Sequence, residues 1–298
     1  MSLISIIMPV YNGQRFVDEA ISSIIEQEYK QIELIIIDDG STDSTNDILT
    51  KWAVKDKRIK IYHQNNSGII SALNKGIEQA TGDYIARMDA DDISHPDRLK
   101  IQYQYMIQND LDVCGCNYFE IDEDNIINGL KIVPKTPEMI KIALCSNVPF
   151  AHPTVMFKAD FLRKNNILYG QSIYKNAEDL ALWMSLYEKG AKFGNVDSIL
   201  FSYRVLSSSL SRKKRKQILE ESSALFNIYF KRNKKTLLAL LDAAAHTMRA
   251  YERIWVLSLC MKFLVRTGNL SILQYIRKFP KKMILNVFLS ELNKILKM

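Results

Sequence analysis

Three aspartates in one short loop are the residues with the clearest chemistry. Asp89, Asp91 and Asp92 directly follow a strand-like run at residues 84–88. Their carboxylates would repel one another, so we expect a cation among them. Oxygen ligands suit Mg²⁺ or Mn²⁺, and Mg²⁺ commonly binds through one or two carboxylates together with substrate phosphates. The loop predicts a metal site with Asp91 and Asp89 as ligands; the alternative is an acidic turn before the next helix.

A second polar loop favours nucleotide binding. Asp38 and Asp39 follow an apolar run and precede Gly40 and Ser41. A carboxylate here can accept hydrogen bonds from a nucleobase imide or from ribose hydroxyls, and Tyr11 can stack on a base. The alternative is a turn that leads into a helix capped by Ser41 or Asp43. The glycine motifs of dinucleotide sites and of P-loop enzymes are absent from the sequence, which argues against both classes.

A third acidic pair stands at the start of a helical pattern. Glu178 and Asp179 precede apolar residues at helical spacing over 180–187. A carboxylate could take the proton of an attacking hydroxyl in a group transfer. The alternative is two acids that simply suit a helix N-terminus. His152 is open to both interpretations, as support for an active site or as a hydrogen-bonded structural histidine.

The elements that must position these loops alternate between strand and helix. Strands are expected at residues 4–8, 32–37, 59–63 and 84–88, and helices at 16–27, 43–54 and 68–80, the last capped by Ser67 and stopped by Gly82. The pattern predicts an α/β fold with a mostly parallel central sheet and helices on both faces. Ligands of such sheets bind beyond the carboxyl ends of the strands, where the polar loops begin.

The order and spacing of the loop motifs resemble family 2 glycosyltransferases of the non-processive bacterial type. The resemblance covers about residues 3–205 and rests on these motifs: Pro9-Val-Tyr-Asn12, Asp38-Asp-Gly-Ser41, Asn66-x-Gly68-x-x-x-Ala72-x-Asn74-x-Gly76, Gly82-Asp-Tyr-Ile85, Asp89-Ala-Asp-Asp92, Pro96-Asp-Arg-Leu99 and Glu178-Asp179. It implies a GT-A fold, inversion at the anomeric carbon and a nucleotide diphospho-sugar donor, most often UDP-linked.

The resemblance also implies roles for individual residues. Asp179 would be the catalytic base, with Glu178 near the acceptor or the donor sugar, and Asp91 with Asp89 would hold Mn²⁺ or Mg²⁺. His152 would support the active site. The nucleotide and donor would contact Pro9, Tyr11, Asn12, Asp39, Asn74, Arg87 and Asp89.

The expected reaction is transfer of a single hexose. The Gln-x-x-Arg-Trp signature of processive synthases is absent from the sequence. We expect UDP-glucose or UDP-galactose as donor and a lipid-linked saccharide as acceptor, in bacterial O-antigen, lipopolysaccharide or capsule assembly. One alternative is a transferase that charges a polyprenyl-phosphate carrier. A sugar-phosphate nucleotidyltransferase would need a glycine-rich, arginine-containing loop after the first strand, and residues 9–15 contain only Gly13.

Charge divides the chain in two. Residues 1–206 carry 21 Lys and Arg against 28 Asp and Glu, whereas residues 207–298 carry 19 against 5. We therefore expect a GT-A domain over 1–206 and a basic helical region over 207–298, with the boundary in the serine-rich stretch 207–211. Helical patterns recur at about 215–230, 237–250, 254–265, 270–279 and 283–296.

The basic region has two interpretations. Its apolar stripes and basic clusters could attach the protein to an anionic membrane surface, or its basic faces could simply be solvated. The longest near-apolar stretch, residues 254–261, is much shorter than the roughly 20 residues that span a bilayer. Nucleic acid is not expected as a partner, because it would leave the acidic loops unexplained. With no signal peptide evident, we expect a cytoplasmic protein held peripherally at the inner membrane.

The cysteines predict no metal or disulfide framework. Cys114, Cys116, Cys145 and Cys260 lack the paired spacing of a zinc site. We expect four reduced structural thiols.

Overall fold

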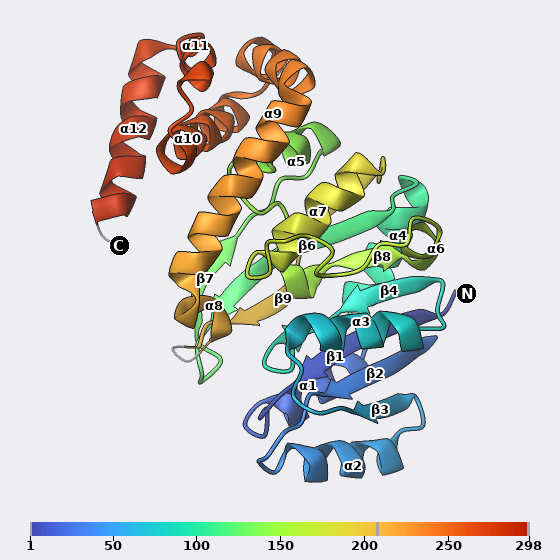
Figure 1. Ribbon diagram of the computed structural model, residues 1–298. Helices are drawn as coiled ribbons and strands as arrows, with labels where there is room; N and C mark the ends of the chain where they lie inside the picture. Colours follow the sequence, from blue (N-terminus) through green and yellow to red (C-terminus); the bar gives the residue numbers. More distant parts are fainter. Residues whose placement is uncertain (1, 207–208, 297–298) are drawn as a thin grey trace. The chain divides into compact units, whose positions relative to one another are not determined.

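The computed structural model describes residues 2–206 and 209–296, which form two compact units (Figure 1). The sheet unit comprises residues 1–135 and 150–213, and the helical unit comprises 136–149 and 214–298. The predicted boundary at 207–211 includes residues 207–208, which lie outside the described residues. The segment 136–149 belongs to the helical unit although it lies inside the region expected to form the first domain.

The sheet unit alternates strands and helices through its first half, as predicted. Its first elements are β1 (Ile4–Val10), α1 (Val17–Ile25), β2 (Ile32–Asp38), α2 (Thr45–Lys55), β3 (Ile59–His63), α3 (Ile69–Gln79), β4 (Tyr84–Arg87), β5 (Ile93–Ser94) and α4 (Arg98–Gln108). Those that follow are β6 (Val113–Ile121), β7 (Ile127–Lys131), η1 (His152–Thr154), β8 (Met156–Lys158), α6 (Ala159–Lys164), α7 (Glu178–Glu188), β9 (Phe193–Arg204) and α8 (Leu210–Lys213).

One sheet joins all these strands in the order β3-β2-β1-β4-β8-β6-β9-β5, with β7 paired to β6. The first four strands are mutually parallel, so β1, β2, β3 and β4 end at the same edge. The strand β8 runs antiparallel to both β4 and β6, while β9 runs parallel to β6. The α/β architecture with a parallel core is therefore confirmed, and antiparallel strands extend it.

Buried residues along β1 and β2 alternate between the two faces of the sheet. Ile6 and Leu34 pack in one core cluster with residues of α1, α2 and α4. Ile7 faces α3, where Gly76 comes so close that an added Cβ would lie 2.3 Å from the Ile7 side chain. Helices thus cover both faces, and the polar ends of the strands stay open at the sheet edge.

Two local predictions about α3 are wrong. Ser67 does not cap the helix: Gly68 is the N-cap residue, with φ of 85°, and the Ser67 amide donates to Asp39 instead. Gly82 does not stop the helix, which ends at Gln79. Gly82 is required because an added Cβ would lie 2.6 Å from the carbonyl oxygen of Leu3.

The helical unit contains α5 (Pro137–Ala143), α9 (Arg215–Thr247), α10 (Ala250–Thr267), η2 (Leu270–Ile272), α11 (Leu273–Ile276) and α12 (Lys281–Leu296). The expected break between helices at 215–230 and 237–250 is wrong, because α9 runs through 33 residues. The basic cluster at 231–235 contains no Gly or Pro, and Lys and Arg are good helix formers. Among the described residues, no helix is both long and apolar enough to cross a membrane.

All four cysteines are buried and free, as predicted. Burial raises the pKa of the Cys116 thiol to about 11, which keeps this group protonated.

Candidate active site

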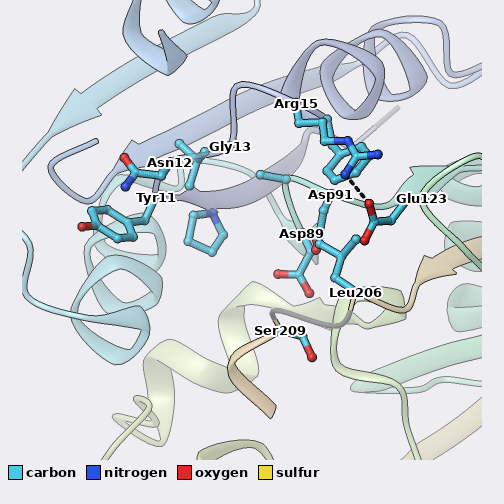
Figure 2. A pocket seen from close by; sticks show the side chains of 13 residues that line it. Tyr11, Asn12, Gly13, Arg15, Asp89, Asp91, Glu123, Leu206 and Ser209 are labelled. Atoms are coloured by element: carbon cyan, nitrogen blue, oxygen red, sulfur yellow. Dashed lines mark hydrogen bonds and ion pairs between the residues drawn. The ribbon is translucent and has the colours of Figure 1, made fainter. Parts of the chain in front are cut away.

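A pocket opens at the carboxyl end of β1 (Figure 2). It has a cavity volume of about 400 Å³, which lies within the usual range for small-ligand sites. Five of the residues predicted to bind the donor or the metal line it: Pro9, Tyr11, Asn12, Asp89 and Asp91. Arg15 and Glu123 form an ion pair in its wall, and Leu206 and Ser209 also line it. The sheet thus brings two loops nearly 80 residues apart into one pocket, as the topology predicts.

The pocket loop that precedes α1 leaves one aromatic ring available. Tyr11 is 52% exposed although it directly follows a fully buried strand. The loop is fixed by Asn12, whose Oδ1 accepts from the Thr42 amide at 2.8 Å and whose own amide donates to Ser41 Oγ at 2.9 Å. An exposed ring on a fixed loop suits stacking against a flat ligand.

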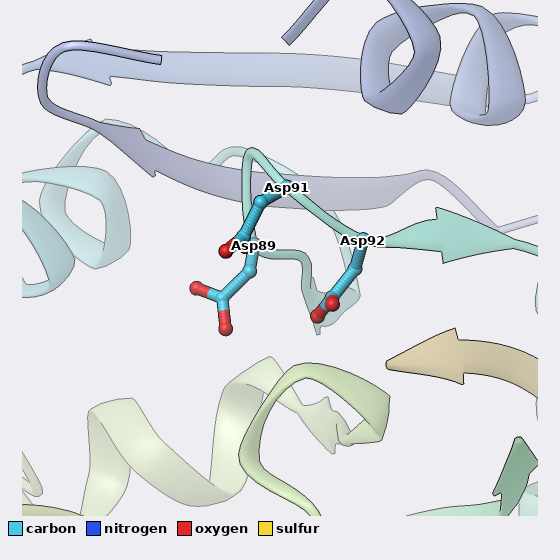
Figure 3. A group of neighbouring side chains, drawn as sticks. All are labelled: Asp89, Asp91 and Asp92. Atoms are coloured by element: carbon cyan, nitrogen blue, oxygen red, sulfur yellow. The ribbon is translucent and has the colours of Figure 1, made fainter. Parts of the chain in front are cut away.

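Asp89, Asp91 and Asp92 form the acidic group that the sequence predicts (Figure 3). One carboxylate oxygen from each lies within 4.8 Å of the others. Burial and the charge of Asp89 raise the pKa of Asp91 to about 6. The same two causes raise the pKa of Asp92 well above its ordinary value. The free carboxylates therefore repel one another, and a cation would relieve that repulsion.

A divalent cation fits this donor set. Asp92 Oδ1 accepts from the Arg204 amide at 2.7 Å, but its buried Oδ2 has no hydrogen-bond partner among the described residues. A buried carboxylate oxygen without a partner is costly unless a ligand or a water molecule reaches it. Clustered hard oxygen donors beside an open pocket match Mg²⁺ or Mn²⁺ bound together with a phosphate ligand.

Arg87 is a buried cation beside this acidic group. Its guanidinium forms an ion pair with Asp89, while its Nε has no hydrogen-bond partner among the described residues. Burial alone would lower the pKa of Arg87, but the neighbouring Asp89 and Asp92 outweigh it and raise that pKa. Arg87, which the sequence predicts to contact the donor, is thus a fixed positive charge whose Nε–H group could donate to a ligand.

Tyr169 links several predicted site residues. The Asn74 side chain clamps its backbone, donating to the Tyr169 carbonyl at 3.1 Å and accepting from its amide at 2.9 Å. Its hydroxyl lies 2.7 Å from His152 Nε2. Burial and the nearby Arg87 lower the pKa of His152 well below its ordinary value, so this imidazole is neutral at neutral pH. Asn74 and His152 therefore support a buried tyrosine.

The acids Glu178 and Asp179 begin α7 close to this tyrosine. Burial raises the pKa of Tyr169, Arg87 lowers it, and the charges of Asp179, Glu178 and Asp89 add to the rise. Burial also raises the pKa of Asp179, and the charge of Arg87 offsets part of that rise. Asp179 Oδ1 accepts from the Leu180 amide at 2.6 Å. Arg87 thus interacts electrostatically with Asp179 as well as with Asp89.

Asp39, which the sequence predicts to hold the nucleotide, lies outside the lining of this pocket. Its carboxylate already accepts from Gln64 Nε2 at 2.7 Å and from the Ser67 and Gly68 amides at 2.8 Å. It therefore holds the loop after β3. One acceptor position of its two oxygens remains for a ligand, because a carboxylate can accept about four hydrogen bonds.

Arg204 is a site residue that sequence reasoning missed. Its side chain is buried and donates to the Asp91 and Asp122 carbonyl oxygens at 2.7 Å and to Glu19 at 2.9 Å. Arg204 thereby holds the loop of Asp91 and Asp92 in place, as residues that bond to the ligands of a metal commonly do. Most of its partners are backbone carbonyls distant in sequence, so no local motif marks it. Tyr169 was missed because its partners, the side chains of Asn74 and His152, lie far from it in sequence.

The sequence matches known glycosyltransferases. The model of Glycosyl transferase family 2 matches residues 5–166. An O-antigen biosynthesis glycosyltransferase, WbnJ, from Escherichia coli is 36% identical over 71% of this chain and 83% of its own. An uncharacterised glycosyltransferase from Haemophilus influenzae is 36% identical over 78% of this chain and 90% of its own. Against a 37% identical glycosyltransferase of Rickettsia conorii, the match spans only 33% of that relative's length.

Solved structures share the fold. TarS of Staphylococcus aureus, residues 1–349 in complex with UDP-GlcNAc, aligns with a TM-score of 0.60 over 95% of this chain and 83% of its own, at 18% identity. The mannosyltransferase PcManGT of Pyrobaculum calidifontis, in complex with GDP-Man and Mn²⁺, aligns with a TM-score of 0.60 over 98% and 87%, at 17% identity. The fold is thus that of GT-A glycosyltransferases, and the chain belongs to glycosyltransferase family 2.

Proposed function

We propose that this glycosyltransferase moves a single hexose from UDP-glucose or UDP-galactose to a hydroxyl of a lipid-linked saccharide, with inversion and with the help of Mn²⁺ or Mg²⁺. The observation that carries the proposal is one pocket lined by Tyr11, Asp89 and Asp91, with Arg87 paired to Asp89 behind it. Stacking, metal-binding and phosphate-facing groups thus stand side by side. The similarity to WbnJ, an O-antigen biosynthesis glycosyltransferase, supports the saccharide-assembly context.

The donor would occupy the pocket. The base would stack on Tyr11, and the remaining acceptor position of Asp39 would meet its imide or the ribose. Asp89 and Asp91, with Asp92 beside them, would hold the cation, which would supply charge stabilisation for the departing diphosphate. The free Nε–H of Arg87 would donate to an oxygen of the donor.

The reaction would proceed by direct displacement. The acceptor oxygen forms a bond to the anomeric carbon while the bond from that carbon to the diphosphate oxygen breaks. Asp179 takes the acceptor proton, and its raised pKa makes it a stronger base than an ordinary aspartate. Asp179 must be ionised to act, so turnover falls as pH drops through its raised pKa. Glu178 would contact the acceptor or the donor sugar, and the neutral His152 would support this wall through Tyr169.

The helical unit would keep the enzyme at the cytoplasmic side of the inner membrane. Residues 214–298 carry 17 Lys and Arg against 5 Asp and Glu. Such a surplus attracts anionic lipid surfaces, where each nearby basic residue contributes about 1 kcal/mol. A lipid-linked acceptor in O-antigen, lipopolysaccharide or capsule assembly would be encountered at that surface.

Replacing the base tests the proposal. Asp179→Asn should lower kcat by at least about 10²-fold, because the carboxylate that accepts the proton is lost. Donor affinity, measured by calorimetry with UDP-glucose and UDP-galactose, should change little. Asp160→Asn on α6 is the matched control, since Asp160 is exposed and forms an ion pair with Lys164 on the same helix. Near-normal turnover of Asp179→Asn would remove it from the mechanism.

A further inference from the structure

The outward side of α12 is apolar. Leu285, Phe288 and Leu289 are 57%, 52% and 48% exposed. Residues three and four apart share one face of a helix, so these three form a single stripe. The other side of α12 packs inside the helical unit: Val287 is buried, and Glu291 accepts a hydrogen bond from Ser258 of α10 at 2.7 Å.

Exposing this apolar stripe to water is unfavourable. A surface helix of a globular domain turns its apolar stripe to the core and its charged residues to solvent. In α12 the buried Val287 already faces the core of the helical unit, and a second stripe of large apolar side chains is exposed to solvent. Contiguous exposed apolar side chains with a basic rim mark interaction surfaces.

Two lysines at the start of α12 lie on the same face as the apolar stripe. Lys281 lies seven residues before Phe288, and Lys282 lies seven before Leu289, so two helical turns bring each pair to the same side. Both lysines are exposed. The surface therefore joins positive charge to apolar side chains, the combination by which interfacial helices recognise anionic lipid.

We propose that α12 is a membrane-docking helix: Leu285, Phe288 and Leu289 enter the boundary between headgroups and acyl chains, while Lys281 and Lys282 contact anionic headgroups. The inference deepens the proposed membrane-side function, since it names the element that inserts. A second copy of the chain is the poorer occupant. Three half-exposed side chains supply far less than the roughly 800 Å² per partner of a standard protein interface.

Flotation of the full chain with vesicles tests the docking. The protein should float with vesicles of phosphatidylcholine and phosphatidylglycerol, and much less with phosphatidylcholine alone. Phe288→Ser should weaken binding to the anionic vesicles by about tenfold, because it removes the largest apolar side chain of the stripe. The control is Val54→Ser: Val54 is 83% exposed on α2, with lysines at positions 51 and 55 but no apolar stripe.

A second variant reports insertion directly. Phe288→Trp should show a blue shift of the added tryptophan emission on anionic vesicles, relative to the parent chain with its three tryptophans. Wild-type flotation of Phe288→Ser, or an unshifted emission, overturns the proposal. So does a concentration-dependent dimer in sedimentation that Phe288→Ser abolishes, since the stripe would then join two copies.

Enzyme assays separate this inference from the proposed reaction. With a water-soluble acceptor analogue, Phe288→Ser should turn over as the wild type does, because α12 contributes nothing to the pocket in the sheet unit. If the wild type floats and inserts but transfers no sugar, the docking inference stands and the proposed reaction fails. If it transfers sugar but does not float, the reaction stands and the docking inference fails.

Discussion

Buried acids lie near both ends of the parallel strands, Glu33 near the start of β2 and Asp91 and Asp92 in the loop after β4, and the two sets have opposite surroundings. Near the start of β2, Glu33 accepts hydrogen bonds from Ser5 at 2.5 Å, from the Thr81 amide and hydroxyl at 2.8 Å, and from Lys60 at 2.7 Å. Burial alone would raise the pKa of Glu33, but these partners outweigh it and lower that pKa to about 2. This carboxylate is stabilised in its charged form.

At the carboxyl edge the balance is reversed. Asp91 and Asp92 lie beside Asp89, and burial together with that charge raises the pKa of both. Asp92 Oδ2 has no hydrogen-bond partner among the described residues. Near the start of the strands Glu33 therefore has the partners that stabilise its charge, whereas at the carboxyl edge Asp91 and Asp92 would need a cation to stabilise theirs. The difference indicates that the first end serves stability and the second serves binding.

The largest expected effect comes from the carboxyl edge. Asp91→Asn should lower turnover by about 10²–10³-fold, because a predicted ligand of the cation that stabilises the leaving diphosphate is lost. The same change should raise the metal-free free energy of unfolding at neutral pH by about 1–2 kcal/mol, since a repelled carboxylate is removed. Chemical denaturation in EDTA and a transfer assay measure the two.

The sign of the pH effect follows from the raised pKa of Asp91. The folded state binds this proton more tightly than the unfolded chain, so metal-free wild type should lose stability as pH rises toward about 6. Asp91→Asn should flatten that slope. Equal or lower stability of the variant at neutral pH would contradict the repulsion among these carboxylates.

Glu33→Gln should do the opposite: the free energy of unfolding falls by about 3 kcal/mol at neutral pH, while turnover of the folded enzyme is retained. Because the folded pKa is about 2 against an ordinary 4.5, the stabilisation is complete above pH 4.5 and is lost as pH falls toward 2. Denaturation at neutral and acidic pH measures it. The control Glu28→Gln removes an exposed pair with Lys100, so the free energy of unfolding should hardly change.

The smallest effect concerns Tyr169. Tyr169→Phe removes one hydroxyl from a buried hydrogen bond and leaves His152 Nε2 without its partner. The free energy of unfolding should fall by about 1–2 kcal/mol, with kcat reduced by a few-fold as the wall near Asp179 loosens. Tyr251→Phe, at an exposed tyrosine of α10, should change neither quantity. If Tyr169→Phe had the same free energy of unfolding and the same kcat as the wild type, the hydroxyl of Tyr169 would contribute neither to stability nor to turnover.

Much of the first half of the fold follows from the sequence. Buried parallel strands such as Ile32–Asp38 are apolar nearly throughout, and the polar loop after each strand is unambiguous. Elements held by tertiary contacts were less predictable. Gly82 serves a close approach to β1 rather than a helix end, and α9 continues through a basic cluster where a break was expected.

For the site, sequence order identifies residues that the sheet edge must collect, because parallel strands end together. Tyr11, Asp89 and Asp91 accordingly line one pocket. Residues whose contacts are distant in sequence leave no such signal: Arg204 donates to the carbonyl oxygens of Asp91 and Asp122, and the backbone of Tyr169 is held by the Asn74 side chain. Neither could be found without the fold.

Calorimetric titration of UDP into the full chain tests the central claim most directly. We predict that the wild type binds UDP with Mn²⁺ present and does not bind it in EDTA. With Mn²⁺ present, Asp91→Asn should also fail to bind UDP, whereas Glu33→Gln should bind it as the wild type does. Equal affinity for UDP in Mn²⁺ and in EDTA would show that the acidic edge of the sheet does not hold a cation for the nucleotide.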